Sequence, residues 1–231
     1  RVCNQSETGA NPGRCLARLA SANMSVLIRG LRGVAVAVTV SLSAVLAPSP
    51  ATAEPPQPSA IAPPAGPAPA WLVADTISGA ILGAQDAFSP RAPASTIKTL
   101  LAMVVFDHLP LETAAPATPA DTDVECSCVE LVPGQVYTAR QLLDALLIVS
   151  GNDAANMLAE MLGGQQTAVA MMNAKALAVG ARATRAASPS GLDGPGWESV
   201  TTPYDLAMIY RSALNYPLFA QILHQSTAAF P

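Results

Sequence analysis

The chain has 231 residues, of which 51% are hydrophobic, so it contains enough apolar material for a sizeable core. Its formal net charge is −4, its basic residues form no block, and aromatic residues make up only 4% of the sequence. Nucleic acid is therefore excluded as an expected partner, because both a basic surface and a set of base-stacking rings are missing.

The N-terminal part has the layout of a secretory signal, from Met24 to Ala53. Arg29 and Arg32 supply a positively charged start, residues 33–46 are uncharged and apolar, and Ala51-Thr52-Ala53 is a small-x-small cleavage site. We expect cleavage after Ala53. An uncleaved anchor is the alternative, although the apolar run is short for a membrane span.

Residues 1–23 precede this signal and are interpreted as an upstream extension that is not native. Residues 54–70 are dominated by Pro and Ala, which predicts an extended linker. The folded domain is expected to cover residues 71–231.

The folded part begins with a predicted hairpin, in which Trp71–Thr76 and Ala80–Ala84 flank the turn Ser78-Gly79. A helix is expected from about Ser95 to His108, because apolar residues recur there in the i, i+3, i+4, i+7, i+8 pattern. The predicted apolar stripe consists of Ile97, Leu100, Leu101, Val104 and Val105.

Residues 111–134 are polar and rich in Pro, which predicts a long loop. Thr138 and Gln141 form a capping box that opens the next helix. Further helices are expected at about 152–162, 165–179, 203–214 and 218–224, with a loop at 190–196. Two strands followed by a run of helices indicate an α+β domain.

Cys126 and Cys128 form a Cys-x-Cys pair, which lacks the second half that a zinc site needs. The only histidines, His108 and His224, do not stand at ligand-like spacings. The pair therefore predicts a surface loop that holds either a disulfide or two thiols, and no metal site is expected.

Ser95 and Lys98 are the main candidates for chemistry. They lie three residues apart at the start of a predicted helix, which places both side chains on one face, one turn apart. A serine hydroxyl becomes a good nucleophile when a neighbouring base takes its proton. Lysine can be that base when burial or nearby positive charge lowers its pKa. The same helix start can offer the Ser95 N–H to an oxyanion.

Ser150-Gly151-Asn152 follows about fifty residues later, at a predicted break between two helices. Such a break can bring a hydroxyl and an amide to Ser95 and Lys98, although the triplet also fits a simple helix-capping turn. A Ser-x-x-Lys motif followed by Ser-x-Asn at this separation is more specific than either motif alone.

In order and spacing, these motifs resemble those of the D-alanyl-D-alanine carboxypeptidases, the low-molecular-mass penicillin-binding proteins of peptidase family S11. Ser190-Gly191-Leu192-Asp193 and Tyr204-Asp205-Leu206-Ala207 are further features similar to that family. The resemblance covers residues 70–231. It implies a β-lactamase/transpeptidase-like α+β fold, in which an antiparallel sheet is joined to a helical subdomain.

The resemblance also implies an exported enzyme of the cell envelope that removes the terminal D-alanine from peptidoglycan stem peptides ending in D-Ala-D-Ala. Ser95 would be the nucleophile, Lys98 the general base and Ser150 a proton relay. Asn152 would bind the substrate backbone. β-Lactams would acylate Ser95 as inhibitors, and neither a metal nor an organic cofactor is implied.

The family's third motif, Lys-Thr-Gly or a close variant, is not found after Asn152. Lys175 is followed by Ala-Leu in a helical pattern, and Arg211-Ser212-Ala213 lacks the glycine. Loss of one oxyanion donor lowers a rate by roughly 10²–10³. We therefore expect a C-terminally truncated chain that lacks the C-terminal strands and has little activity. Membrane association would need the N-terminal segment or a lost C-terminus.

Three alternatives stay open from the sequence. A serine β-lactamase would share the fold and the Ser-x-x-Lys motif, but Gly151 stands where those enzymes typically carry Asp. A non-catalytic pseudoenzyme that binds the cell wall is the second. A Ser-His-Asp hydrolase is the third, although neither His108 nor His224 lies in a plausible triad context.

Overall fold

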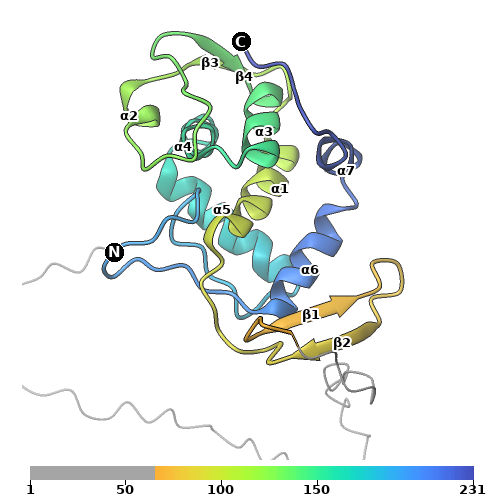
Figure 1. Ribbon diagram of the computed structural model, residues 1–231. Coiled ribbons are helices and arrows are strands. Elements are labelled where there is room, and N and C mark those ends of the chain that lie inside the picture. The colour runs from red at the N-terminus through yellow and green to blue at the C-terminus, as the bar shows by residue number, and fades with distance from the viewer. Residues whose placement is uncertain (1–65) are drawn as a thin grey trace, which may run out of the picture. The chain divides into compact units, whose positions relative to one another are not determined.

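The computed structural model describes residues 66–231. The predicted signal at 24–53, the extension before it and most of the predicted linker lie outside the described residues. The described chain begins with a β-hairpin and continues into a group of helices (Figure 1). No helix within the described part is long and apolar enough to cross a membrane.

The predicted first hairpin is confirmed, because β1 (Trp71–Ala74) and β2 (Ile81–Gln85) are antiparallel neighbours. In its turn, the Asp75 carboxylate accepts hydrogen bonds from the hydroxyl and the N–H of Ser78, both at 2.6 Å. These bonds hold the pKa of Asp75 below its ordinary value. One side of the hairpin packs on α6 (Pro203–Ala213), as Figure 1 shows.

The helix expected from Ser95 is split into a 3-10 turn, η1 (Ala94–Ile97), and the helix α1 (Lys98–His108). Every residue from Lys98 to Val105 is at most 3% exposed, so α1 is buried all round and not only along a stripe. Its sequence explains this, because the run Leu100–Val105 contains no polar residue. α1 packs against α3, α4, α5 and α6, and is the centre of the helical part.

The other predicted helices are present, with small shifts at their ends. Thr138 is the N-cap of α3, and the predicted capping box with Gln141 is confirmed. Thr202 likewise caps α6 by accepting the Asp205 N–H at 3.1 Å. The remaining bounds are α3 (Ala139–Ile148), α4 (Asn152–Met161), α5 (Gln165–Ala178) and α7 (Pro217–Leu223).

The prediction of one long loop at 111–134 is wrong in part. β3 (Ala114–Pro116) and the short α2 (Pro119–Thr122) lie inside it, and β3 pairs with β4 (Val136–Thr138) as a second antiparallel hairpin. Each strand has three residues and β3 ends in proline, so neither shows the alternation from which a strand is inferred. In Figure 1 this hairpin lies at the opposite end of the helices from β1 and β2.

The loop between α2 and β4 contains a disulfide between Cys126 and Cys128. The sequence had left a disulfide and two thiols as alternatives, and the structure contains the disulfide. Cys126 is exposed and Cys128 is half-buried. The loop therefore presents a covalent cross-link at the surface.

Candidate active site

The four residues that the sequence singles out meet where the start of α1 faces the break between α3 and α4. Lys98 Nζ lies 3.0 Å from Ser95 Oγ and 3.1 Å from Ser150 Oγ. It also donates to the Ser150 carbonyl oxygen at 2.9 Å and to Asn152 Oδ1 at 2.6 Å. Segments more than fifty residues apart in the sequence are thus joined through one amine.

Lys98 is 2% exposed, whereas Ser95 beside it is exposed. Burial lowers the pKa of the Lys98 amine to about 8, and the carboxylate of Asp153 opposes part of this shift. About a tenth of the amine is therefore neutral at pH 7, far more than for an ordinary lysine. The pair combines a hydroxyl that solvent can reach with a neighbouring base.

The contacts around Lys98 Nζ exceed what one ammonium can donate. An ammonium carries three hydrogens, whereas four oxygen atoms lie within 3.1 Å. A neutral amine has two hydrogens and a lone pair, and that lone pair can accept the proton of a serine hydroxyl. The arrangement thus allows proton transfer from Ser95 or Ser150 to Lys98.

At the candidate site, two residues other than glycine adopt the left-handed backbone conformation, which residues with a side chain normally avoid. Ala94, next to Ser95, has φ +47°, and Ser150 has φ +61°. Such a conformation costs roughly 1–2 kcal/mol in a residue with a side chain. Strain of this kind persists where the surrounding structure imposes it, and it is concentrated at functional sites.

The loop at 190–196 is part of the structure that holds Ala94 in this conformation. Gly191 has φ +84°, and a Cβ atom there would lie 2.1 Å from the Ala94 carbonyl oxygen. Only a glycine allows this approach. The Ser190-Gly191 pair, quoted above only as a family feature, is therefore packed against the turn that carries Ser95.

The amide of Asn152 is held by the loop between α2 and β4. Its Nδ2 donates to the Glu125 carbonyl oxygen at 2.6 Å, which leaves Oδ1 to face Lys98. The Asn152 side chain is 4% exposed. The sequence did not indicate that Glu125 would contact Asn152, or that Gly191 would pack against Ala94. The only sign that the Glu125 loop was unusual was the neighbouring Cys-x-Cys pair.

The two histidines lie apart from the cluster. His108 is the last residue of α1, so the rise of an α-helix places it about 15 Å along the axis from Lys98. His224 caps the end of α7. Lys175, the second lysine of the chain, forms an ion pair with Asp107. Among the described residues, therefore, neither a histidine nor a second lysine joins Ser95.

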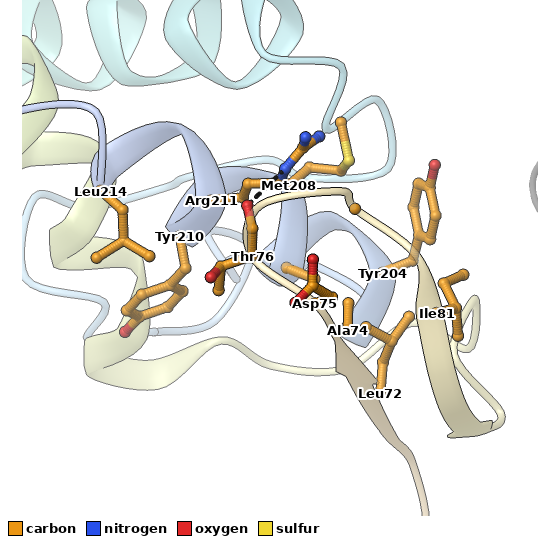
Figure 2. Close-up of a pocket in the computed structure, with 12 residues that line it drawn as sticks. Leu72, Ala74, Asp75, Thr76, Ile81, Tyr204, Met208, Tyr210, Arg211 and Leu214 are labelled. Atoms are coloured by element: carbon orange, nitrogen blue, oxygen red, sulfur yellow. Dashed lines mark hydrogen bonds between the residues drawn. The ribbon is translucent and has the colours of Figure 1, made fainter.

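A separate cavity of about 230 Å³ lies between the β1–β2 hairpin and α6 (Figure 2). Its lining is mostly apolar and includes Leu72 and Met208. Arg211 donates to the carbonyl oxygens of Thr76 at 3.1 Å and Ile77 at 3.0 Å, and so ties the hairpin turn to α6. The cavity is separate from the candidate active site, because its lining includes none of the residues Ser95, Lys98, Ser150 and Asn152.

Comparisons with known proteins point to one family. A profile of the D-alanyl-D-alanine carboxypeptidases, peptidase S11, matches residues 57–230. The D-alanyl-D-alanine carboxypeptidase DacB2 of Mycobacterium tuberculosis H37Rv is 55% identical over 168 residues, which cover 73% of this chain and 58% of that protein. A D-alanyl-D-alanine endopeptidase of Pseudomonas aeruginosa is 34% identical over 153 residues, which cover 65% of this chain and 48% of that protein.

The fold is similar to that of a solved D-alanyl-D-alanine carboxypeptidase from Mycobacterium tuberculosis H37Rv. The TM-score is 0.73 at 55% identity, and the match covers 76% of this chain and 67% of that chain. This likeness confirms the predicted α+β, penicillin-binding type of fold. The chain spans 58% of the length of the curated Mycobacterium relative.

The lowered pKa of Lys98 can be tested by competitive labelling with acetic anhydride, because the chain contains only two lysines. We expect the labelling of Lys98 to rise with a midpoint near pH 8, since only the neutral amine reacts. Below that midpoint the neutral fraction falls about tenfold per pH unit.

Lys175 is the internal control for this labelling. Partial burial opposes its charged form, but hydrogen bonds to Asp107 and Tyr216 raise its pKa, so it should react only at higher pH. In urea both lysines should titrate near 10.5. A Lys98 midpoint near 10.5 in the folded chain would contradict the expected effect of burial.

The role of Gly191 can be tested by comparing Gly191→Ala with Gly196→Ala. Both positions have nearly the same positive φ, +84° and +82°, but nothing lies within 4 Å of a Cβ atom at Gly196. We expect Gly191→Ala to displace Ala94 and to slow labelling of Ser95 by a fluorescent penicillin at least tenfold. Gly196→Ala should keep the labelling rate. Equal losses of rate in both variants, at equal urea stability, would show that the contact with Ala94 is unimportant.

Proposed function

Because this chain belongs to the D-alanyl-D-alanine carboxypeptidase family, peptidase S11, we propose that it removes the terminal D-alanine from peptidoglycan stem peptides through an acyl-enzyme on Ser95. The observation that carries the proposal is the buried Lys98 amine within hydrogen-bond distance of the exposed Ser95. A general base and an accessible nucleophile are what acyl transfer requires.

The proposed first step is the attack of Ser95 Oγ on the carbonyl carbon between the two D-alanine residues. Neutral Lys98 takes the hydroxyl proton as the C–O bond forms. Ser150, whose Oγ lies 3.1 Å from Lys98 Nζ, gives its hydroxyl proton to the departing nitrogen and takes the proton from Lys98 in return, and the C–N bond breaks. D-Alanine leaves, and an ester joins Ser95 to the shortened peptide.

The second step is hydrolysis of this ester. Water gives a proton to the neutral Lys98 amine and attacks the ester carbonyl carbon, the bond from that carbon to Ser95 Oγ breaks, and Lys98 returns the proton to Ser95. The shortened peptide leaves with a new carboxyl group. Asn152 is proposed to bind the substrate backbone. Its Nδ2 carries two hydrogens, of which Glu125 takes one, so the second is available to a substrate carbonyl.

We test the proposed function with a fluorescent penicillin and a peptide ending in D-Ala-D-Ala. We expect stoichiometric acylation of Ser95 and release of D-alanine, both measured over a time course of hours. Ser95→Ala and Lys98→Met should lose both reactions, whereas Ser89→Ala, at a half-buried serine in the loop before the site, should keep them.

The outcomes of this test separate the alternatives. Rapid, repeated hydrolysis of nitrocefin would favour a β-lactamase. Binding of the peptide without acylation would favour a pseudoenzyme. Cleavage only of internal peptide bonds would favour an endopeptidase, the activity named for the Pseudomonas relative. Acylation at a residue other than Ser95 would contradict the proposed mechanism.

We further propose that residues 24–53 direct export, that residues 54–70 form a linker, and that the domain at 71–231 acts outside the cytoplasm. The basic, apolar and small-x-small sequence pattern supports export. A disulfide between Cys126 and Cys128 also fits an oxidising compartment.

Export can be tested by producing the chain from Met24 in a bacterium and sequencing the N-terminus of the secreted protein. We expect it to begin at Glu54. Ala53→Asp should block cleavage, because that position requires a small uncharged residue. Ala60→Asp, the same change in the linker, should not block it. A secreted protein that retains residues 24–53 would contradict the assigned cleavage site.

A further inference from the structure

The loop that carries the disulfide is held against the start of α4 on both sides of the cross-link. Residues 123–135, between α2 and β4, form neither helix nor strand. Keeping such a segment in one conformation costs backbone entropy, which fixed contacts must offset. Glu130 is also in the left-handed conformation, with φ +59°, so the loop needs fixed contacts to keep its shape.

The residue before the first cysteine and the residue between the two cysteines both contact Asn152 or its neighbours. The Glu125 carbonyl oxygen accepts from Asn152 Nδ2, and the Ser127 carbonyl oxygen accepts from the Asn152 backbone N–H, both at 2.6 Å. Ser127 Oγ donates to the Val149 carbonyl oxygen at 3.0 Å. Ser127 lies between the two cysteines, so the disulfide closes around the residue that contacts both ends of the α3–α4 break.

The contacts after the disulfide go to Asp153. The backbone N–H groups of Val129 and Leu131 each donate to Asp153 Oδ2 at 3.1 Å. Asp153 is 1% exposed, so these bonds lie inside the protein. The short cross-linked loop is thus bound both to Asn152 of the candidate site and to its neighbour Asp153.

The contact with Glu125 determines which end of the Asn152 amide faces Lys98. A carbonyl oxygen accepts hydrogen bonds but cannot donate them, so the Glu125 oxygen selects Nδ2 as its partner. Oδ1 is then turned to Lys98 Nζ, 2.6 Å away. If the Glu125 carbonyl moved, the amide could rotate by half a turn and place its NH2 group against the lysine amine.

We propose that the Cys126–Cys128 disulfide is a positioning device, which holds the Glu125 and Ser127 carbonyls so that Asn152 presents Oδ1 to Lys98. Its reduction is expected to loosen Asn152 and thereby to slow the acylation of Ser95. The effect on acylation rests on the proposed function, whereas the effect on Asn152 does not.

The disulfide is accessible to the reaction that would release it, because Cys126 is exposed. A dithiol reductant supplies two electrons and two protons. The S–S bond breaks, both cysteines become thiols, and the reductant is oxidised to a disulfide. The position of Asn152 would then depend on the redox state around the protein.

The experiment compares the full chain before and after treatment with a dithiol reductant, and mass spectrometry confirms the state of the cysteines. Amide hydrogen exchange by NMR reports on the Asn152 backbone N–H, whose acceptor is the Ser127 carbonyl. We expect reduction to speed its exchange at least tenfold while amides of α1 stay protected. Penicillin acylation of Ser95 should slow at least tenfold, since a group misplaced by about 1 Å can lower a rate by about 10²-fold.

Two variants identify the cysteines responsible. Cys126→Ser combined with Cys128→Ser should behave like the reduced chain and should not respond to reductant. Cys3→Ser combined with Cys15→Ser should keep the full response, because this variant retains the Cys126–Cys128 disulfide. The proposal would be overturned if the response to reductant were lost in the Cys3 and Cys15 variant and kept in the Cys126 and Cys128 variant.

Asn152→Asp separates positioning from general stability. This variant has no Nδ2, so the bond to Glu125 is already lost and reductant should cause no further loss of acylation. Unchanged exchange at Asn152 after reduction, or an equal rise at every amide of the domain, would overturn the proposal. If Ser95 is not acylated even before reduction, the proposed function fails, and the exchange at Asn152 alone decides the role of the disulfide.

Discussion

Burial of the Lys98 amine among oxygen atoms is the interaction on which the candidate site depends. A buried charge is costly unless hydrogen bonds replace its lost water, and Lys98 obtains these from Ser95, Ser150 and Asn152. The residue cannot avoid burial, because α1 is surrounded by other helices. The core therefore determines both the position of the amine and its lowered pKa. Ser150 accordingly offers both a carbonyl and a hydroxyl, in a backbone conformation that is itself unfavourable.

Much of this arrangement was predictable from the sequence, because its signals are local. The capping box of Thr138 determines where α3 begins, and both this start and the start of α6 at residue 203 were located correctly. Ser-x-x-Lys at a helix start and Ser-x-Asn at a helix break identified the four residues that the structure brings together. The β3–β4 hairpin was missed, because strands of three residues leave no periodic pattern.

Other parts of the site depend on contacts that no local pattern encodes. The approach of Gly191 to Ala94 joins residues almost a hundred positions apart, so the sequence shows only a glycine in a loop. The orientation of the Asn152 amide depends on a backbone carbonyl at Glu125, and any residue type there would supply that oxygen. The 3-10 turn at Ser95 begins with Ala94, whose left-handed conformation cannot be predicted from its residue type.

The bonds from Arg211 to the hairpin turn bear on how the chain folds during its synthesis. A two-stranded hairpin is marginally stable by itself, and β1 and β2 obtain their tie to the helices from a side chain 135 residues after Thr76. The ribosome makes the hairpin first and the helix that receives it much later. While the intervening helices are made, the hairpin has no α6 to dock on, and its strand edges can pair with other chains. In this domain, the hairpin is therefore synthesised early but can become stable only after α6 has been made.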